Sequence, residues 1–356
     1  MSSALTVFVY EHFTAGGCPE GDLPAGLAAE ALGILWAVLR DFRDWGKVRT
    51  IALLDPRFEQ RVPGLDRGTL PADEVIPARP GDHESVYLSL LKRCDAVLPI
   101  APETDGILSS LAEQAETEGI PLLGCSAQAA ATAGNKAVCS RLFDLAKIPV
   151  PETRSASFLT AAHVAGQMRC PLVIKPIDGV GCEGVCRINS LSELPEALAL
   201  VRRSTTQELI LLQTLAQGTH ASVSLLVAGG GCMPLSLNLQ LIEAGVPYRY
   251  LGSRVPFRHP MADRAMELAA SAVGLIPGVK GYVGVDLVLA EDHVELIEIN
   301  PRITTSYIGL RRVAQLNIAG AIWNACMQDT LPAHFPLDGE TVIWKDDPGS
   351  WGMPAL

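Results

Sequence analysis

The chain has 356 residues, is 48% hydrophobic and carries a formal net charge of −11. This length allows two or three domains with substantial cores. The acidic balance argues against a general nucleic-acid or anionic-membrane binder, although a few local cations can still bind small phosphates. Because no apolar run is long enough to cross a bilayer and the first residues do not resemble a signal peptide, we expect a cytoplasmic protein.

Strands and helices alternate over residues 1–125. Apolar runs predict strands at 5–10, 50–54, 96–100 and 121–123, and helical spacing predicts helices at 27–42, 84–93 and 107–118. This alternation is typical of an open parallel α/β sheet. Ligands commonly bind in loops that follow such strands, which draws attention to Glu11 and Glu103. Simple polar turns explain both loops equally well.

A connecting segment and a small α+β unit follow. Residues 126–150 are expected to hold a helix, 127–146, with Asn135 and Lys136 in it, and then a proline-containing linker. The small unit, 151–212, contains helices at 160–168 and 190–203 and strands at 172–175, 185–188 and 208–213.

The larger remaining unit spans residues 213–330. We expect strands at 221–228 and 234–241, a loop at 242–260, helices at 261–274 and 309–327, and a strand pair between these helices. The tail, 331–356, shows no periodic pattern.

The strand pair carries two acids and an amide. Strands 283–289 and 294–299 are predicted to form a hairpin around the loop Glu291–His293, with Asp286 opposite Glu298 and Asn300 on the same face. Opposed carboxylates are unfavourable unless a cation lies between them, and Mg²⁺ prefers such oxygen ligands. A solvated hairpin is the alternative, and a one-residue change in the loop would separate the acids.

A glycine loop lies between two predicted strands. Gly179, Gly181 and Gly184 match the spacing GxGxxG, but the extended segment 185–188 follows where a dinucleotide-binding fold requires a helix. Such a loop can instead fold over phosphates. Lys175, in the apolar strand before it, would find an anionic partner there, unless it is a surface lysine on an edge strand.

The order of these motifs resembles the ATP-grasp superfamily. The order is Asn135-Lys136, VIKP with the glycine loop, a strand ending at Gln213, Asp286 in VGVDLVL, and EINPR at 298–302. The resemblance covers roughly residues 126–327. It implies an α/β fold, in part α+β, in which an open parallel pre-ATP-grasp domain precedes a two-lobed ATP-grasp fold.

The resemblance also implies that the protein binds ATP with Mg²⁺ or Mn²⁺. On this resemblance the ATP phosphates would be bound by Lys136 and Lys175, the lid loop formed by Gly179, Gly181 and Gly184, and adenine contacted by Gln213 and the backbone of Leu215. The metal would be held by Asp286, Glu298 and Asn300, and the catalytic cations would be Arg302 and Lys175. This chain departs from many relatives at Gln213, where they have Glu. It also lacks the acid often found after the glycine at 218, which leaves the ribose contacts open.

Three looser motifs, EHFTAGG, APETDGIL and NPRITTSYIGL, are similar to tyramine-glutamate ligases of methanofuran biosynthesis. That resemblance implies small-molecule substrates, namely the γ-carboxylate of L-glutamate and the amine of tyramine or tyrosine, joined through an acyl-phosphate. The candidate substrate contacts are Arg254, Thr304, Thr305, Ser306, Tyr307, Glu11 and Glu103. For Arg254, a carboxylate clamp and a structural ion pair are equally compatible with its sequence context.

Two alternatives stay open. The first keeps the fold and changes the substrate, as in a D-alanine-type or carbamoyl-forming ligase. The second is an ATP-binding regulatory protein without turnover, which the presence of Asp286, Glu298, Asn300 and Arg302 together disfavours. The sequence leaves the oligomeric state open between a monomer and a homodimer.

Overall fold

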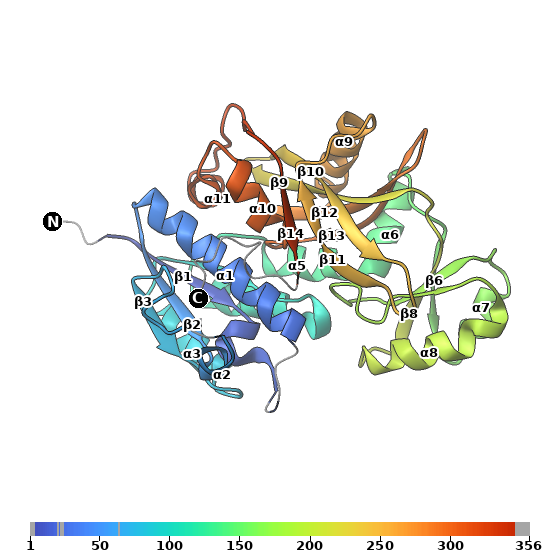
Figure 1. Ribbon diagram of the computed structural model, residues 1–356, viewed down its shortest axis with the longest axis horizontal. Helices are drawn as coiled ribbons and strands as arrows, with labels where there is room; N and C mark the ends of the chain where they lie inside the picture. Colours follow the sequence, from blue (N-terminus) through green and yellow to red (C-terminus); the bar gives the residue numbers. More distant parts are fainter. Residues whose placement is uncertain (1–3, 20, 22–24, 63–64, 346–356) are drawn as a thin grey trace.

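The computed structural model describes residues 4–345, apart from 20, 22–24 and 63–64. Three sheets lie side by side, with the N-terminal sheet at one end of the molecule and the smallest sheet, beside helices α7 and α8, at the other (Figure 1). The largest sheet lies between them. None of the described helices is long and apolar enough to cross a membrane.

The N-terminal sheet is parallel, as predicted. Its strand order is β3-β2-β1-β4, and Leu122 extends it through a bridge to Val97. The strands are β1 (Thr6–Glu11), β2 (Arg49–Leu54), β3 (Glu74–Pro77) and β4 (Ala96–Ile100); the helices are α1 (Ala25–Trp45), α2 (Pro56–Arg61), α3 (His83–Leu91) and α4 (Ile107–Thr117). Short helical turns η1 (Phe13–Gly17) and η2 (Thr104–Gly106) follow β1 and β4.

The predicted helix 127–146 is two helices, α5 (Ala127–Gly134) and α6 (Lys136–Leu145). Asn135 separates them, because its backbone is extended and its side-chain oxygen accepts hydrogen bonds from the N–H groups of Ala137 and Val138, both at 3.1 Å. An Asn in this position caps a new helix. Lys136 is consequently the first residue of α6.

The smallest sheet is antiparallel and holds the glycine loop. Its order is β5-β8-β6-β7, with β5 (Thr153–Ser157), β6 (Leu172–Pro176), β7 (Cys186–Ile188) and β8 (Leu209–Thr214). The turn η3 (Leu191–Glu193) and the helices α7 (Ala161–Ala165) and α8 (Leu194–Arg203) complete this unit. A strand follows the glycine loop, as predicted. The short polar strand β5 carries no hydrophobic alternation and was not predicted.

The largest sheet has the order β13-β12-β9-β10-β11-β14. Its strands are β9 (Thr219–Ala228), β10 (Gly231–Glu243), β11 (Arg249–Val255), β12 (Gly281–Leu289), β13 (Val294–Asn300) and β14 (Thr341–Trp344). Helices α5, α6 and α9 (Ala262–Val273) share a core with one face. Helix α1 packs with α10 (Ser306–Val313) and α11 (Ile318–Met327) against the other face, so the N-terminal unit and this sheet share a core.

Three predictions for the C-terminal half are wrong. The expected loop 242–260 contains β11, which completes hydrogen bonding along β10. The expected helix 309–327 is divided into α10 and α11, and Asn317 caps the second by accepting from the N–H of Gly320. The tail contributes β14, which pairs with β11. Residues 346–356 of the tail lie outside the described part of the chain.

Candidate active site

The hairpin β12–β13 brings the two predicted acids together. Asp286 pairs with Glu298, and Gly284 pairs with Asn300. The expected loop was Glu291–His293, but Leu289 pairs directly with Val294, so the turn runs from 290 to 293. This longer turn alone would place Asp286 opposite residue 297.

A β-bulge at Ile297 restores the register. Leu287 pairs with Leu296, whereas Asp286 pairs with Glu298, so one extra residue lies on β13 between these pairs. A bulge re-aims neighbouring side chains, and both Ile297 and Glu298 line the cavity described next. The predicted pairing is therefore confirmed, although the turn that should produce it differs.

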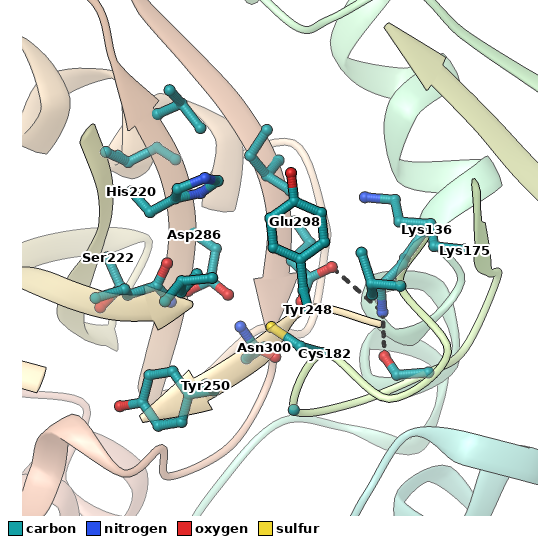
Figure 2. Close-up of a pocket in the computed structure, with 18 of the residues that line it drawn as sticks. Lys136, Lys175, Cys182, His220, Ser222, Tyr248, Tyr250, Asp286, Glu298 and Asn300 are labelled. Carbon is teal, nitrogen blue, oxygen red and sulfur yellow. Dashed lines mark hydrogen bonds and ion pairs between the residues drawn. The ribbon is translucent and has the colours of Figure 1, made fainter. Parts of the chain in front are cut away.

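A cavity lies between the smallest and the largest sheets (Figure 2). Most of the predicted site residues line it: Lys136, Lys175, Gly179, Gly181, Gln213, Leu215, Asp286, Glu298, Asn300, Arg302, Thr304, Thr305 and Ser306. In Figure 2, Asp286, Glu298 and Asn300 form one wall, and Lys136 and Lys175 lie across the cavity from Asp286. The solvated-hairpin alternative is excluded, because the acids face this cavity.

The two carboxyl groups of this wall have different electrostatic environments. Burial raises the pKa of Asp286 to about 7, and the neighbouring charge of Glu298 acts in the same direction, against hydrogen bonds from Gln240 and Asn300. Burial also favours protonation of Glu298, but Lys136 and Lys175 outweigh it and hold its pKa below the usual value. A proton is thus retained on Asp286 more readily than on Glu298.

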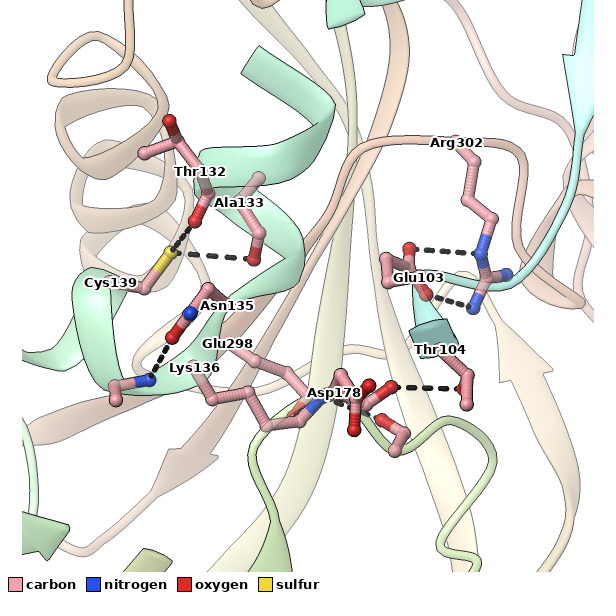
Figure 3. Close-up of polar contacts among 12 residues, drawn as sticks. Glu103, Thr104, Thr132, Ala133, Asn135, Lys136, Cys139, Asp178, Glu298 and Arg302 are labelled. Carbon is pink, nitrogen blue, oxygen red and sulfur yellow. Dashed lines mark hydrogen bonds and ion pairs between the residues drawn. The ribbon is translucent and has the colours of Figure 1, made fainter. Parts of the chain in front are cut away.

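Lys136 connects the wall with the glycine loop. Its Nζ lies 3.4 Å from Oε2 of Glu298 and donates a 2.6 Å hydrogen bond to the carbonyl oxygen of Gly179 (Figure 3). Asn135 fixes the start of α6 and therefore the backbone of Lys136. Lys136 is therefore held where an anion between the loop and the wall would meet it.

Lys175 is a buried cation on β6. Its side chain is part of a residue only 4% exposed, and burial lowers its pKa. Among the described residues, no hydrogen bond or ion pair of its ammonium group is found. A buried ammonium without a direct partner is costly, so this site favours binding of an anionic group.

The glycine loop has the backbone that its glycines permit. Gly181 and Gly184 have φ of 61° and 68°, and a Cβ at Gly184 would lie 2.7 Å from Cβ of Ser204. Larger residues would be strained at both positions. Gly184 lines an adjoining depression rather than the main cavity.

Gln213 and Leu215 occupy the end of β8 beside the cavity. The Gln213 Nε2 group donates to Oγ1 of Thr153 at 2.8 Å, which orients the side-chain amide. The N–H of Leu215 donates to the carbonyl of Pro171 at 3.1 Å. Any nucleobase contact by Leu215 would therefore use its other atoms.

Arg302 and Glu103 form a buried pair between the segment after β13 and the N-terminal unit. Nε and Nη2 of Arg302 donate to the two carboxylate oxygens of Glu103 at 3.0 and 3.2 Å (Figure 3). Glu103 was predicted to contact substrate. It is instead placed to orient the guanidinium group, which lines the cavity itself.

Three further predicted substrate residues do not line the cavity. Tyr307 lies on the buried side of α10 and donates its hydroxyl to Oδ2 of Asp41 at 2.7 Å. Glu11 is also buried and accepts from the N–H of Thr14 at 2.7 Å; burial raises its pKa to about 7. Arg254 is exposed and lies 3.8 Å from Glu340, the structural ion pair that was its alternative.

The sequence did not identify several residues that line the cavity. Gln240 from β10, His220 and Ser222 from β9, and Tyr248 and Tyr250 near β11 all face it, as does Glu30 from α1. None belongs to a local motif. Only the pairing of distant strands, and the packing of α1 against α10, brings them together.

The N-terminal unit also touches the glycine-loop unit. The Thr104 hydroxyl donates to the carbonyl of Asp178 at 3.0 Å (Figure 3). The N–H of Asp105 donates to the carboxylate of Asp178 at 3.0 Å. Thr206, after α8, donates to the carboxylate of Asp105 at 2.5 Å. Turn η2 thus contacts the smaller unit at two places, the glycine loop and the segment after α8.

Comparison with known families identifies this architecture. A pre-ATP-grasp domain model matches residues 48–130, and an ATP-grasp domain model matches residues 133–306. The chain belongs to the ATP-grasp superfamily. Asp286, Glu298 and Asn300, which form the acid–amide wall of the cavity, lie within the matched ATP-grasp domain. Glu103 lies within the matched pre-ATP-grasp domain.

The chain is similar to tyramine–L-glutamate ligase of Methanocaldococcus jannaschii, with 33% identity over 64% of this chain. The alignment covers 63% of that protein. Among solved structures, an ATP-grasp superfamily protein from Archaeoglobus fulgidus matches 96% of this chain and 99% of its own, with 24% identity and a TM-score of 0.67. A biotin carboxylase from Campylobacter jejuni matches 94% of this chain and 74% of its own, with 15% identity and a TM-score of 0.74. These structural matches show the shared fold.

Proposed function

We propose that this protein is an ATP-dependent carboxylate–amine ligase that forms an amide through an acyl-phosphate. One observation carries the proposal: the acid–amide wall of β12 and β13 shares a cavity with Lys136, Lys175 and the glycine loop. Arg302 lines the same cavity and is held by a bidentate pair. Binding a nucleotide without turnover would not require all of these groups in one place.

The residues present fit ATP and a divalent cation. Asp286, Glu298 and Asn300 offer oxygen ligands of the kind that Mg²⁺ or Mn²⁺ takes, and a bound cation would neutralise phosphate charge and polarise the transferring group. In the described part of the chain, no three His, Cys, Asp or Glu residues group as a complete metal site. Phosphate oxygens are therefore expected to complete the coordination.

The side chains supply positive charge where negative charge develops. A substrate carboxylate oxygen attacks the γ-phosphorus of ATP, the bond to the β-phosphate oxygen breaks, and ADP leaves. Lys136, Lys175 and Arg302 are placed to stabilise the phosphates during this transfer. An amine nitrogen then attacks the acyl carbon, loses a proton, and displaces phosphate to leave the amide. Closure of the glycine-loop unit excludes water, which would hydrolyse the acyl-phosphate.

For the substrates, we propose the γ-carboxylate of L-glutamate and the amine of tyramine or tyrosine, as in methanofuran-type cofactor biosynthesis. The similarity to tyramine–L-glutamate ligase supports this choice. Thr304, Thr305 and Ser306 line the cavity directly after the metal-binding strand and are the proposed substrate contacts. An ATP-grasp ligase for another amino acid, of the D-alanine type or carbamoyl-forming, keeps the same nucleotide site and is the second candidate.

The test is a product analysis with purified protein, Mg²⁺, ATP, glutamate, and tyramine or tyrosine. We expect ADP, phosphate and an amide of the mass of the joined substrates, with nucleotide turnover dependent on both substrates. AMP with pyrophosphate would contradict the phosphoryl-transfer step. A screen of other carboxylate and amine pairs, followed by phosphate release, separates the two candidates.

A further inference from the structure

Glu30 is an acidic residue of the cavity that no motif identified. Among the described residues that line this cavity, the acids are Asp286, Glu298 and Glu30. The first two form the metal-binding wall. Glu30 comes from α1, in the N-terminal unit, and its carboxylate is left for another role.

The carboxylate of Glu30 already holds a primary ammonium group in this structure. Nζ of Lys345 lies 3.0 Å from its Oε2, and the hydroxyl of Thr305 donates to its Oε1. The side chains of Glu30 and Lys345 are each only 19% exposed. A carboxylate in a partly desolvated setting, oriented by a hydroxyl, is well suited to charge-assisted recognition of an ammonium group.

This carboxylate lies at the substrate end of the cavity. Thr304 to Ser306 follow the metal-binding strand, and Thr305 contacts Glu30 directly. Tyr250 is beside the same pair, since the charge of Glu30 and the hydroxyl of Thr305 both act on its phenol group. In Figure 2, Tyr250 lies well away from Lys136 and Lys175, which are the proposed phosphate-binding residues.

We propose that Glu30 is the binding residue for the primary ammonium group of an amino substrate, and that Lys345 competes with this substrate for the same carboxylate. The inference rests on the proposed function, in which L-glutamate carries an α-ammonium group and tyramine or tyrosine brings another. Both groups present the same chemistry to Glu30, and the experiment below distinguishes them.

The position of Lys345 explains how such competition would work. Lys345 follows β14, and its Nζ lies 4.0 Å from the place of a Cβ on Gly181. The ammonium group thus lies between the glycine loop and Glu30. A substrate ammonium that takes its place preserves the ion pair at Glu30 while Lys345 moves toward the loop. If the ion pair between Glu30 and Lys345 were purely structural, in contrast, loss of either partner would disturb the site equally.

The test combines calorimetric binding with steady-state kinetics for the parent, Glu30→Gln and Lys345→Met proteins. Glu118→Gln, at an exposed site, is the matched control. Each protein is titrated with glutamate and with tyramine in the presence of Mg²⁺ and ADP, and thermal unfolding verifies that each is folded. We expect Glu30→Gln to weaken one of the two ligands, and to raise its KM, by about tenfold or more, the loss typical of a charge-assisted hydrogen bond. Lys345→Met should strengthen binding of that ligand.

Glutarate, which lacks the ammonium group, identifies the ligand. If Glu30 binds the glutamate α-ammonium, glutarate should bind the parent and Glu30→Gln proteins equally; if it binds the amine, the loss should fall on tyramine. Equal affinities of the folded parent and Glu30→Gln proteins for both ligands would overturn the inference. Weakening by Lys345→Met as large as that by Glu30→Gln would also overturn it. If the parent protein binds these ligands through Glu30 but forms no amide, the proposed ligation alone is refuted. If the parent protein binds neither ligand, both the proposed ligation and the role of Glu30 are refuted.

Discussion

Glu103 and Arg302, 199 positions apart in the sequence, form a bidentate pair with N–O distances of 3.0 and 3.2 Å. Glu103 follows β4 in the pre-ATP-grasp domain, whereas Arg302 follows β13, the strand of the proposed metal ligands. The Glu103 side chain is 4% exposed and that of Arg302 is 16% exposed, so water does little to screen the pair. The N-terminal domain therefore fixes the direction of a cation that the ATP-grasp domain presents to the cavity.

Glu103→Gln should lower kcat more than it raises the KM for ATP. Glutamine keeps one acceptor but loses the charge and the second carboxylate oxygen, so the Arg302 guanidinium is less firmly oriented. Removing one partner of a buried pair typically costs about 3–5 kcal/mol, and the conservative change should cost less. Steady-state kinetics and thermal unfolding measure both effects. Glu113→Gln, exposed on α4, should change neither, and an unchanged kcat in Glu103→Gln would refute the positioning role.

Lys175→Met should abolish turnover and at the same time raise the unfolding temperature. Lys175 is buried, and no ion pair or hydrogen bond of its ammonium is found in the described chain. Replacing an unpaired buried charge by an apolar side chain of similar length removes a desolvation cost. Differential scanning calorimetry and ATP turnover test the two parts. Lys92→Met, at an exposed position, is the control, and a marked loss of stability in Lys175→Met would contradict this account.

Stability of the metal-free protein should fall as the pH rises toward 7, in part through Asp286. Its folded-state pKa of about 7 lies above the ordinary value of 3.8, so the folded protein holds this proton more tightly than the unfolded chain does. Protonated Asp286 therefore makes its full contribution to stability at pH values below the ordinary pKa, and this contribution is lost as the pH rises through the folded-state pKa. Asp286→Asn should reduce the slope of unfolding temperature against pH in this interval.

Glu11 provides a matched comparison, because burial raises its pKa to about 7 as well but it lies outside the cavity. Glu11→Gln should reduce the same slope. Adding Mg²⁺ with ADP should remove the contribution of Asp286 to the slope of unfolding temperature against pH, because metal binding requires the carboxylate form of Asp286. The contribution of Glu11 to this slope should remain. If Mg²⁺ with ADP changed the slope equally in Asp286→Asn and parent proteins, Asp286 would not be a metal ligand.

Asp105→Gly should loosen the contact between the N-terminal domain and the glycine-loop unit. Asp105 has φ of 53°, which glycine adopts without strain, so the change removes its side-chain contacts while the turn is retained. The lost hydrogen bond from Thr206 at 2.5 Å is charge-assisted but solvent-exposed, so its loss should cost about 1 kcal/mol, which corresponds to roughly a fivefold rise in the KM for ATP. The ratio of amide to ADP should also fall as water enters. Lys147→Gly, at an exposed residue whose φ of 59° glycine also adopts without strain, serves as control, and an unchanged ratio and KM would show that this contact does not control closure.

Local sequence patterns predicted the parallel first sheet, the glycine loop between strands and the pairing of Asp286 with Glu298. These features depend on alternation and spacing over a few residues. The acid pairing was predicted from a shorter turn than the one present, and the bulge at Ile297 compensates. Turn length and bulges leave little trace in a single sequence. The predicted pairing of Asp286 with Glu298 is correct because the longer turn and the bulge shift the register by one residue in opposite directions.

Long-range packing was harder to predict. Tyr307 follows strand β13 closely in sequence, yet the first turn of α10 directs it to Asp41 in α1. Glu30 lies in an amphipathic helix that gives no sign of a ligand site, and it reaches the cavity only because α1 packs beside α10. Strand β14 was missed because its four residues gain their stability from pairing with β11.

Transfer of oxygen from the carboxylate substrate to phosphate tests the central claim most directly. Glutamate labelled with ¹⁸O in its γ-carboxylate is incubated with the protein, Mg²⁺, ATP and the amine, and the phosphate product is analysed by mass spectrometry. An acyl-phosphate passes one labelled oxygen to each phosphate formed, because the acyl carbon–oxygen bond breaks when the amine attacks. We predict phosphate with one ¹⁸O atom and unlabelled ADP. Labelled AMP, or amide formation with unlabelled phosphate, would contradict the proposed chemistry.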